Sequence, residues 1–80
     1  MQSAAADLAF AMRTINALKT GQARHLREAT GASQANIAKV LEVTRQAVSQ
    51  WESGIRQPSA KHAIAYGRLL QRLARTSRVA

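Results

Sequence analysis

The sequence contains no cysteine, one proline, one residue each of tryptophan, tyrosine and phenylalanine, and no long apolar run. Without cysteine the chain can form neither a disulfide framework nor a thiolate zinc site, and His25 and His62 lack the spacing of metal ligands. No segment approaches the ~20 apolar residues of a membrane span, and Asp7 interrupts the alanine-rich start where a secretory signal would be apolar. We therefore expect a small cytoplasmic protein with no metal, no cofactor and no membrane contact.

Acidic residues are also scarce, since four Asp and Glu stand against twelve Lys and Arg and give a formal net charge of +8. This charge exceeds what a small domain needs for solubility and favours a polyanionic partner. Basic surfaces also attract membranes and acidic proteins, and a cationic surface can serve solubility alone. The partner must therefore be identified from motifs rather than from charge.

β-Branched residues are scattered and do not alternate, so the sequence predicts helices and no strand. Apolar spacing and helix-end signals divide the chain into helices over residues 3–19, 22–30, 34–41, 45–53 and 60–76. Ser33 and Thr44 are expected as N-caps, and Gly31 and Gly54 as the glycines that follow helix ends. The expected fold is an all-α bundle of five helices that forms a single domain over residues 1–80.

The helices at residues 34–41 and 45–53 are short and joined by a short turn, which is the arrangement of a helix-turn-helix over residues 34–53. Val48 and Trp51 lie one turn apart on the inner face of the second helix. An exposed tryptophan could stack on a base, but this position favours packing in the core. The first helix of the pair is expected to contribute Ala38 to the same contact.

The outer face of the second helix carries Arg45, Gln46, Ser49 and Gln50, with no acidic residue among them. Arg can donate two hydrogen bonds to guanine, and Gln can match the donor and acceptor of adenine. The same residue types also occur on ordinary polar helix faces. Their position on the outer side of a helix-turn-helix favours a surface that reads bases in the major groove of DNA.

The stretch "LREATGASQANIAKVLEVTRQAVSQWESGIRQPSAKHAIAYGRLL", from Leu26 to Leu70, resembles the phage Cro/cI repressor family, also called XRE-type. The resemblance rests on "GASQANIA", on "VTRQAVSQWESG" and on the following "PS". It implies a lambda-repressor-like fold preceded by an additional N-terminal helix within residues 1–20. It also implies a transcriptional regulator, in particular a repressor that binds a palindromic DNA operator as a homodimer at the nucleoid.

The resemblance assigns roles to individual residues. Gln34 is expected to touch a phosphate and to orient Arg45, while Thr44 lies at the DNA backbone and Arg56 holds adjacent phosphates. The expected DNA-binding residues are Ser33, Gln34, Thr44, Arg45, Gln46, Ser49, Gln50, Arg56 and Lys61. Arg27 and Glu52 match a family pair that forms a structural salt bridge, and a catalytic role for Glu52 is not expected because no second titratable group accompanies it.

Two positions depart from the family pattern. Glu42 replaces the usual glycine of the turn, and a side chain in a left-handed conformation costs about 1 kcal/mol there. Ala32 replaces a larger apolar residue and would leave a gap. The N-terminal helix, whose expected apolar stripe combines Leu8, Met12 or Ala11, Ile15 and Leu18, is the candidate that fills this gap or forms part of a dimer.

The last helix, over residues 60–76, has a basic face that consists of Lys61, Arg68, Arg72 and Arg75. This face can be plain solvated surface, a contact for outer phosphates, or a contact for an acidic protein. Apolar residues left over from the core would suit a twofold interface between two copies; the candidates are Ile64, Leu69, Leu70 and Leu73.

The alternatives to a sequence-specific DNA-binding regulator are an antitoxin or co-regulator, an enzyme and an RNA-binding protein. An antitoxin or co-regulator would bind DNA together with a partner protein. An enzyme is not expected, because no nucleophile–base pair, metal-ligand cluster or phosphate-cradling glycine loop is present, and Gly21, Gly31, Gly54 and Gly67 suit helix ends or close packing. RNA binding is disfavoured because exposed aromatic residues are scarce.

Overall fold

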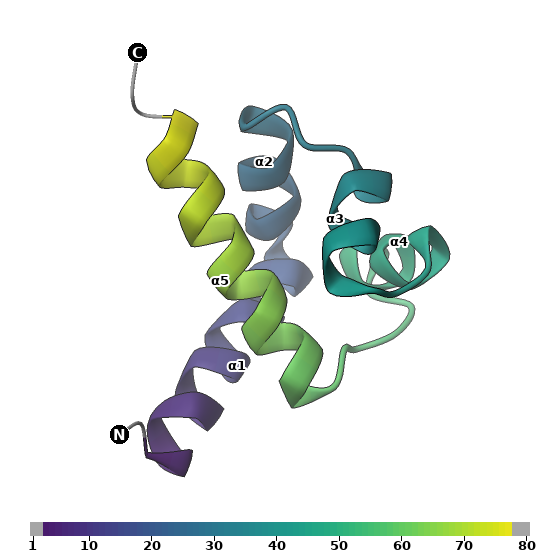
Figure 1. Cartoon of the computed structure of the whole chain (residues 1–80). Helices are drawn as coiled ribbons and strands as arrows, with labels where there is room; N and C mark the ends of the chain where they lie inside the picture. The colour runs from purple at the N-terminus through teal and green to yellow at the C-terminus, as the bar shows by residue number, and fades with distance from the viewer. Residues whose placement is uncertain (1–2, 78–80) are drawn as a thin grey trace.

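The computed structural model describes residues 3–77, which form five helices and no strand. The helices are α1 (Ala4–Thr20), α2 (Gln22–Ala29), α3 (Gln34–Leu41), α4 (Arg45–Ser53) and α5 (Ala60–Ser77). In Figure 1, α5 runs across the molecule, with α3 and α4 on one side of its N-terminal half and α1 crossing behind it. The all-α, five-helix architecture expected from the sequence is confirmed. None of the helices in residues 3–77 is long and apolar enough to cross a membrane.

The helix ends follow the local signals in the sequence. The hydroxyls of Ser33 and Thr44 accept hydrogen bonds of 3.0 Å from the backbone N–H groups three residues further on, as expected for N-caps. Asn36 completes a capping box by accepting from the backbone N–H of Ser33. Gly31 and Gly54 both have a φ of +81°, the left-handed conformation that favours glycine after a helix.

The core gathers side chains from all five helices. Trp51 is 6% exposed and Val48 is fully buried, so the interpretation of both as core residues is confirmed. The main cluster consists of Leu18, Ala23, Ile37, Ala38, Val48, Trp51, Tyr66 and Leu70. Leu69 and Leu73 pack against this cluster, and Ile64 packs against a second one. The apolar side chains of α5 that were candidates for an interface between two copies therefore pack within the molecule.

The apolar stripe expected on α1 is partly wrong. Leu8 and Met12 are 58% and 54% exposed, whereas the buried face of α1 consists of Ala11, Thr14, Ile15 and Leu18. Leu8 and Met12 are large, but α1 packs through the face that carries Ala11 and Thr14, and Thr14 lies against Gly67 of α5. Leu18 belongs to the main cluster against which Ala32 packs.

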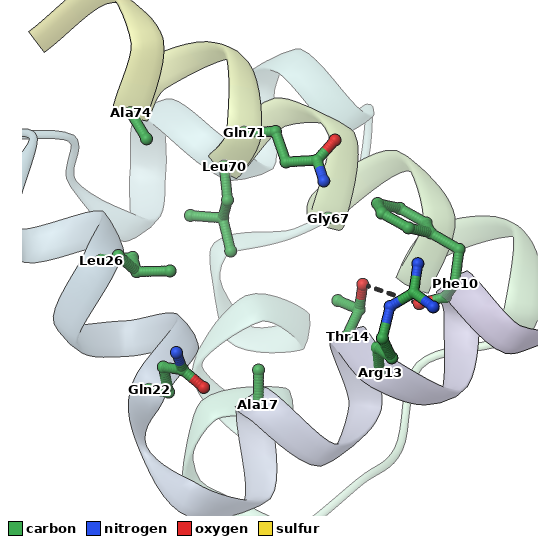
Figure 2. A pocket seen from close by; sticks show the side chains of 10 residues that line it. All are labelled: Phe10, Arg13, Thr14, Ala17, Gln22, Leu26, Gly67, Leu70, Gln71 and Ala74. Carbon is green, nitrogen blue, oxygen red and sulfur yellow. Dashed lines mark hydrogen bonds between the residues drawn. The ribbon is translucent and has the colours of Figure 1, made fainter. Parts of the chain in front are cut away.

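The close approach of α1 and α5 occurs at Gly67, which is buried in the middle of α5. A Cβ atom added at this position would lie 2.8 Å from Cε2 of Phe10 and would also collide with the hydroxyl of Thr14. Figure 2 shows Gly67 on α5 near the side chains of Phe10 and Thr14 on α1; these residues belong to the lining of a groove of about 240 Å³ between α1, α2 and α5. The sequence predicts that each glycine lies at a helix end or at a site of close packing, and Gly67 lies at a site of close packing.

We predict that Gly67→Ala lowers the free energy of unfolding by about 1–2 kcal/mol. The added methyl group overpacks the contact between α1 and α5, which typically costs about 1–3 kcal/mol. This cost exceeds the gain of up to about 1 kcal/mol from the higher helix propensity of alanine. Urea denaturation followed by circular dichroism measures this change. In a Thr14→Ala background, which removes one of the two colliding groups, the loss should shrink. An equal loss in both backgrounds would contradict the packing explanation.

Candidate nucleic-acid interface

The turn between α3 and α4 is closed by backbone hydrogen bonds around Glu42. Glu42 has φ +57° and ψ +44°, so it adopts the left-handed conformation although it is not glycine. Its N–H donates to the carbonyl of Lys39 at 3.3 Å, and the N–H of Val43 donates to that of Ala38 at 3.0 Å. This pair of bonds is a Schellman motif. The turn therefore has the shape that glycine would give, at the expected cost in backbone strain.

This turn and the core together set the orientation of α4. Val48 and Trp51 face inward, and the indole ring lies 5.5 Å from the ring of His62 and 6.3 Å from that of Tyr66, both on α5. On the opposite face Arg45 and Gln46 are exposed, while Ser49 and Gln50 are half-buried. Packing against α3, α1 and these two rings of α5 thus leaves the four expected base readers on the accessible side of α4.

A polar hollow of about 480 Å³ lies along one side of α4, between this helix, the loop that follows it and the start of α5. Thr44, Gln46, Gln50 and Arg56 line it, so four of the expected DNA-binding residues meet in one concave surface. The backbone N–H of Arg56 donates to the carbonyl of Gln50 at 3.2 Å, which ties the loop to α4. No acidic residue lines the hollow. Its polar, acid-free lining suits contact with DNA, and Arg56 can meet a phosphate there.

The other expected DNA-binding residues lie around this hollow and do not line it. Ser33 and Gln34 are at the N-terminus of α3, Arg45 and Ser49 lie on α4 outside the hollow's lining, and Lys61 is exposed in the first turn of α5. Lys61 shares an exposed basic face of α5, as expected, with Arg68, Arg72 and Arg75. Arg68 forms an ion pair of 3.8 Å with Asp7 of α1, so part of this face interacts with the protein itself.

Beneath the interface, the carboxylate of Glu52 accepts hydrogen bonds from three other helices. Arg27 of α2 donates Nε to Oε2 at 2.7 Å and Nη2 to Oε1 at 2.9 Å, so the salt bridge that the resemblance implies is present and is bidentate. Gln34 of α3 donates Nε2 to Oε1 at 3.0 Å, and Tyr66 of α5 donates its hydroxyl to Oε2 at 2.6 Å. Each carboxylate oxygen thus has two donors.

The comparison with known protein families agrees with this geometry. Residues 24–75, more than half of the chain, match a family model described as helix-turn-helix. The chain belongs to the XRE-type helix-turn-helix family, to which the Cro and cI repressors belong. It is accordingly a DNA-binding transcription regulator of the XRE type. No curated protein and no solved structure matches it significantly. The whole of α1 precedes the matched region of this XRE-type protein.

The charges of the network are set by burial and by hydrogen bonds. The side chains of Arg27 and Glu52 are only 8% and 2% exposed. Burial raises the pKa of Glu52, but the hydrogen bonds that its carboxylate accepts outweigh burial and hold the pKa below its ordinary value. Burial, and then the hydrogen bond to Glu52, raise the pKa of Tyr66 above its ordinary value. Glu52 therefore accepts as an anion and Tyr66 donates as a neutral phenol.

Several residues near the interface of this XRE-type protein were not singled out from the sequence. Gln57, Ser59 and His62 line the polar hollow, and Ser59 also caps α5 by accepting from the N–H of His62 at 3.3 Å. Their position directly after the helix-turn-helix was the available signal. Tyr66 carried no signal, because a tyrosine in an apolar helix pattern looks like a core residue. Among residues 3–77 no group of three or more acidic or histidine side chains could hold a metal ion.

Proposed function

We propose that this protein is a sequence-specific repressor that places α4 in the major groove of a palindromic operator and binds it as a homodimer. The observation that carries the proposal is the acid-free face of α4, with Arg45 and Gln46 exposed beside a polar hollow that contains Arg56. Side chains on α4 reach base edges, and the loop and helix ends around it contact phosphates. All five helices act as one non-enzymatic DNA-binding domain, in the cytoplasm and at the nucleoid.

The proposal divides the interface into readers and anchors. The readers are Arg45, Gln46, Ser49 and Gln50. The anchors are Ser33, Gln34, Thr44, Arg56 and Lys61. Readers carry sequence preference because they meet base edges, whereas anchors contribute sequence-independent attraction to phosphates.

We predict that Arg45→Ala or Gln46→Ala relaxes the preference for single base pairs by about 1–3 kcal/mol, while Arg56→Ala weakens binding to all sequences alike and reduces the salt slope by about 1. Selection of bound genomic fragments first defines the operator. Fluorescence anisotropy with the operator and its single-base variants, at several salt concentrations, then measures each protein. Arg13→Ala is the matched control, because it removes the same charge from the groove between α1, α2 and α5. Identical behaviour of the Arg45 and Arg56 variants would contradict the division.

Binding to a palindrome requires two domains with their recognition helices about 34 Å apart on one side of the DNA. The large apolar side chains that remain exposed on this chain, and so are candidates for the contact between copies, include Leu8, Met12, Val40 and Ile55. Sedimentation of the complex with operator DNA gives its stoichiometry. Two chains per operator support the proposal, and a single chain that binds with full affinity contradicts it.

An antitoxin or co-regulator is the second candidate function. The exposed basic face of α5, formed by Lys61, Arg68, Arg72 and Arg75, suits an acidic protein surface as well as DNA. An equimolar partner encoded by a neighbouring gene that co-purifies with the chain would favour this function.

A further inference from the structure

The side-chain amide of Gln34 has a defined orientation in the structure. Gln34 is the first residue of α3, at the edge of the interface, and it is half-buried. Its Nε2 donates to Oε1 of Glu52 at 3.0 Å, so the nitrogen end of the amide is turned towards the buried carboxylate. Gln34 thereby joins the interface to the hydrogen-bond network below it.

The carboxylate of Glu52 can only accept, and this property dictates the orientation of the amide. An ionised carboxylate has no proton to donate, so it cannot form a hydrogen bond with the oxygen of the Gln34 amide. Once one N–H of Nε2 is bound to Glu52, the other N–H and the amide oxygen keep fixed directions. A free surface glutamine would exchange between both orientations of its amide and among several rotamers.

Tyr66 helps to hold the carboxylate itself. Its hydroxyl donates to Oε2 at 2.6 Å, on the other oxygen from the one that binds Gln34. Tyr66 is fully buried, and its ring lies 6.3 Å from that of Trp51, so its hydroxyl is held in place by packing. Loss of this bond leaves Oε2 with Arg27 alone and removes one of the four hydrogen bonds that fix the carboxylate, so the direction of Oε1 towards Gln34 is less tightly defined.

We propose that Glu52 and Tyr66 are positioning residues for DNA binding, because they orient the Gln34 amide so that its second N–H meets the DNA backbone. This inference rests on the proposed function, and in particular on a contact between Gln34 and a phosphate. A fixed donor binds phosphate better than a mobile one because its conformational entropy is already lost. The affinity for DNA therefore depends on a buried residue of α5 that does not touch the DNA.

A double-mutant cycle on DNA affinity tests the inference. Gln34→Ala should weaken binding to the operator on the order of tenfold, as expected for a hydrogen bond to a charged group. Tyr66→Phe keeps the buried ring and removes only the hydroxyl, and it should weaken binding roughly threefold by leaving the amide mobile. In the Gln34→Ala background Tyr66→Phe should have no further effect, because its action passes through Gln34.

A merely structural role of Tyr66 would give a different pattern. Ile37→Val, a change at a buried position on α3, destabilises the fold without touching the network and should leave DNA affinity unchanged at temperatures where all variants are folded. The side-chain NH₂ resonances of Gln34 in nuclear magnetic resonance spectra provide a readout without DNA. In the wild type and in Ile37→Val, their chemical shifts should differ from those of a solvent-exposed glutamine amide. In Tyr66→Phe, the chemical shifts should move towards those of a solvent-exposed amide.

The outcomes separate this inference from the proposed function. An equal loss from Tyr66→Phe in both backgrounds, or no loss in the wild-type background, overturns the inference. Operator binding that is insensitive to Gln34→Ala also overturns it, although the protein would still be a DNA-binding repressor. A wild-type chain that selects no DNA sequence overturns the proposed function itself.

Discussion

Deletion of residues 1–20 is expected to leave a chain without a cooperative thermal transition. Ala11, Ile15 and Leu18 of α1 are at most 6% exposed, and α1 contacts α2, α4 and α5. Burial of a large aliphatic side chain stabilises by about 1.5–3 kcal/mol, and removal of the helix also exposes the residues that it covers. Native proteins have a total stability of only about 5–15 kcal/mol, and a chain this short lies towards the low end. The free energy lost on deletion of α1 therefore exceeds the total free energy of unfolding.

A point substitution tests the same claim in the intact chain. Leu18→Ala should lower the free energy of unfolding by about 2–5 kcal/mol, because Leu18 is 3% exposed within the main cluster. Met12→Ala on the same helix should change it by less than about 0.5 kcal/mol, because Met12 is 54% exposed. Calorimetry of the truncated chain and urea denaturation of the two variants measure these effects. A truncated chain with the wild-type melting temperature would contradict the role assigned to α1.

The second large effect is expected for Glu52→Ala. The substitution leaves the guanidinium of Arg27 buried without its carboxylate, and breaking a buried pair in this way costs about 3–5 kcal/mol. It also removes the acceptor of Gln34 and Tyr66. Glu28→Ala is the matched control, since its ion pair with Arg24 is exposed and contributes at most about 1 kcal/mol. Equal urea midpoints of the two variants would contradict the importance of the network.

The depressed pKa of Glu52 adds a dependence on pH. A carboxyl whose pKa is lower in the folded state than in the unfolded state stabilises the fold above its unfolded pKa. This contribution is lost as the pH falls through the folded pKa. We therefore expect the wild type to lose stability on acidification below the ordinary range of a glutamate, and Glu52→Gln to lose less over the same interval. Urea midpoints between pH 7 and pH 3 measure the difference.

Features that depend on local sequence were predictable. Ser33 and Thr44 begin helices by capping them with their side chains, and Gly54 ends a helix because it adopts the left-handed conformation easily. These roles do not depend on distant residues. The faces of α4 follow from its helical period, which separates Val48 and Trp51 from Arg45 and Gln46. The partners Arg27 and Glu52 lie far apart in the chain, and only the family resemblance identified them.

Features that depend on how the helices cross were not predictable. The period of α1 allowed a stripe that includes Leu8 and Met12, but the structure buries the face of Ala11 and Thr14, with Thr14 against Gly67. Hydrophobicity alone cannot make this choice, because the depth of approach depends on the partner helix. Likewise, nothing in the sequence around Tyr66 indicates that its hydroxyl reaches Glu52.

By itself, then, the sequence determined the five helices, the helix-turn-helix and the acid-free face of α4, because capping, helical period and charge are properties of short segments. The tertiary structure alone decided the contact face of α1, the polar hollow beside α4 and the convergence of α3 and α5 on Glu52. These arrangements join residues from separate helices, and the distances between their atoms exist only after the helices have packed.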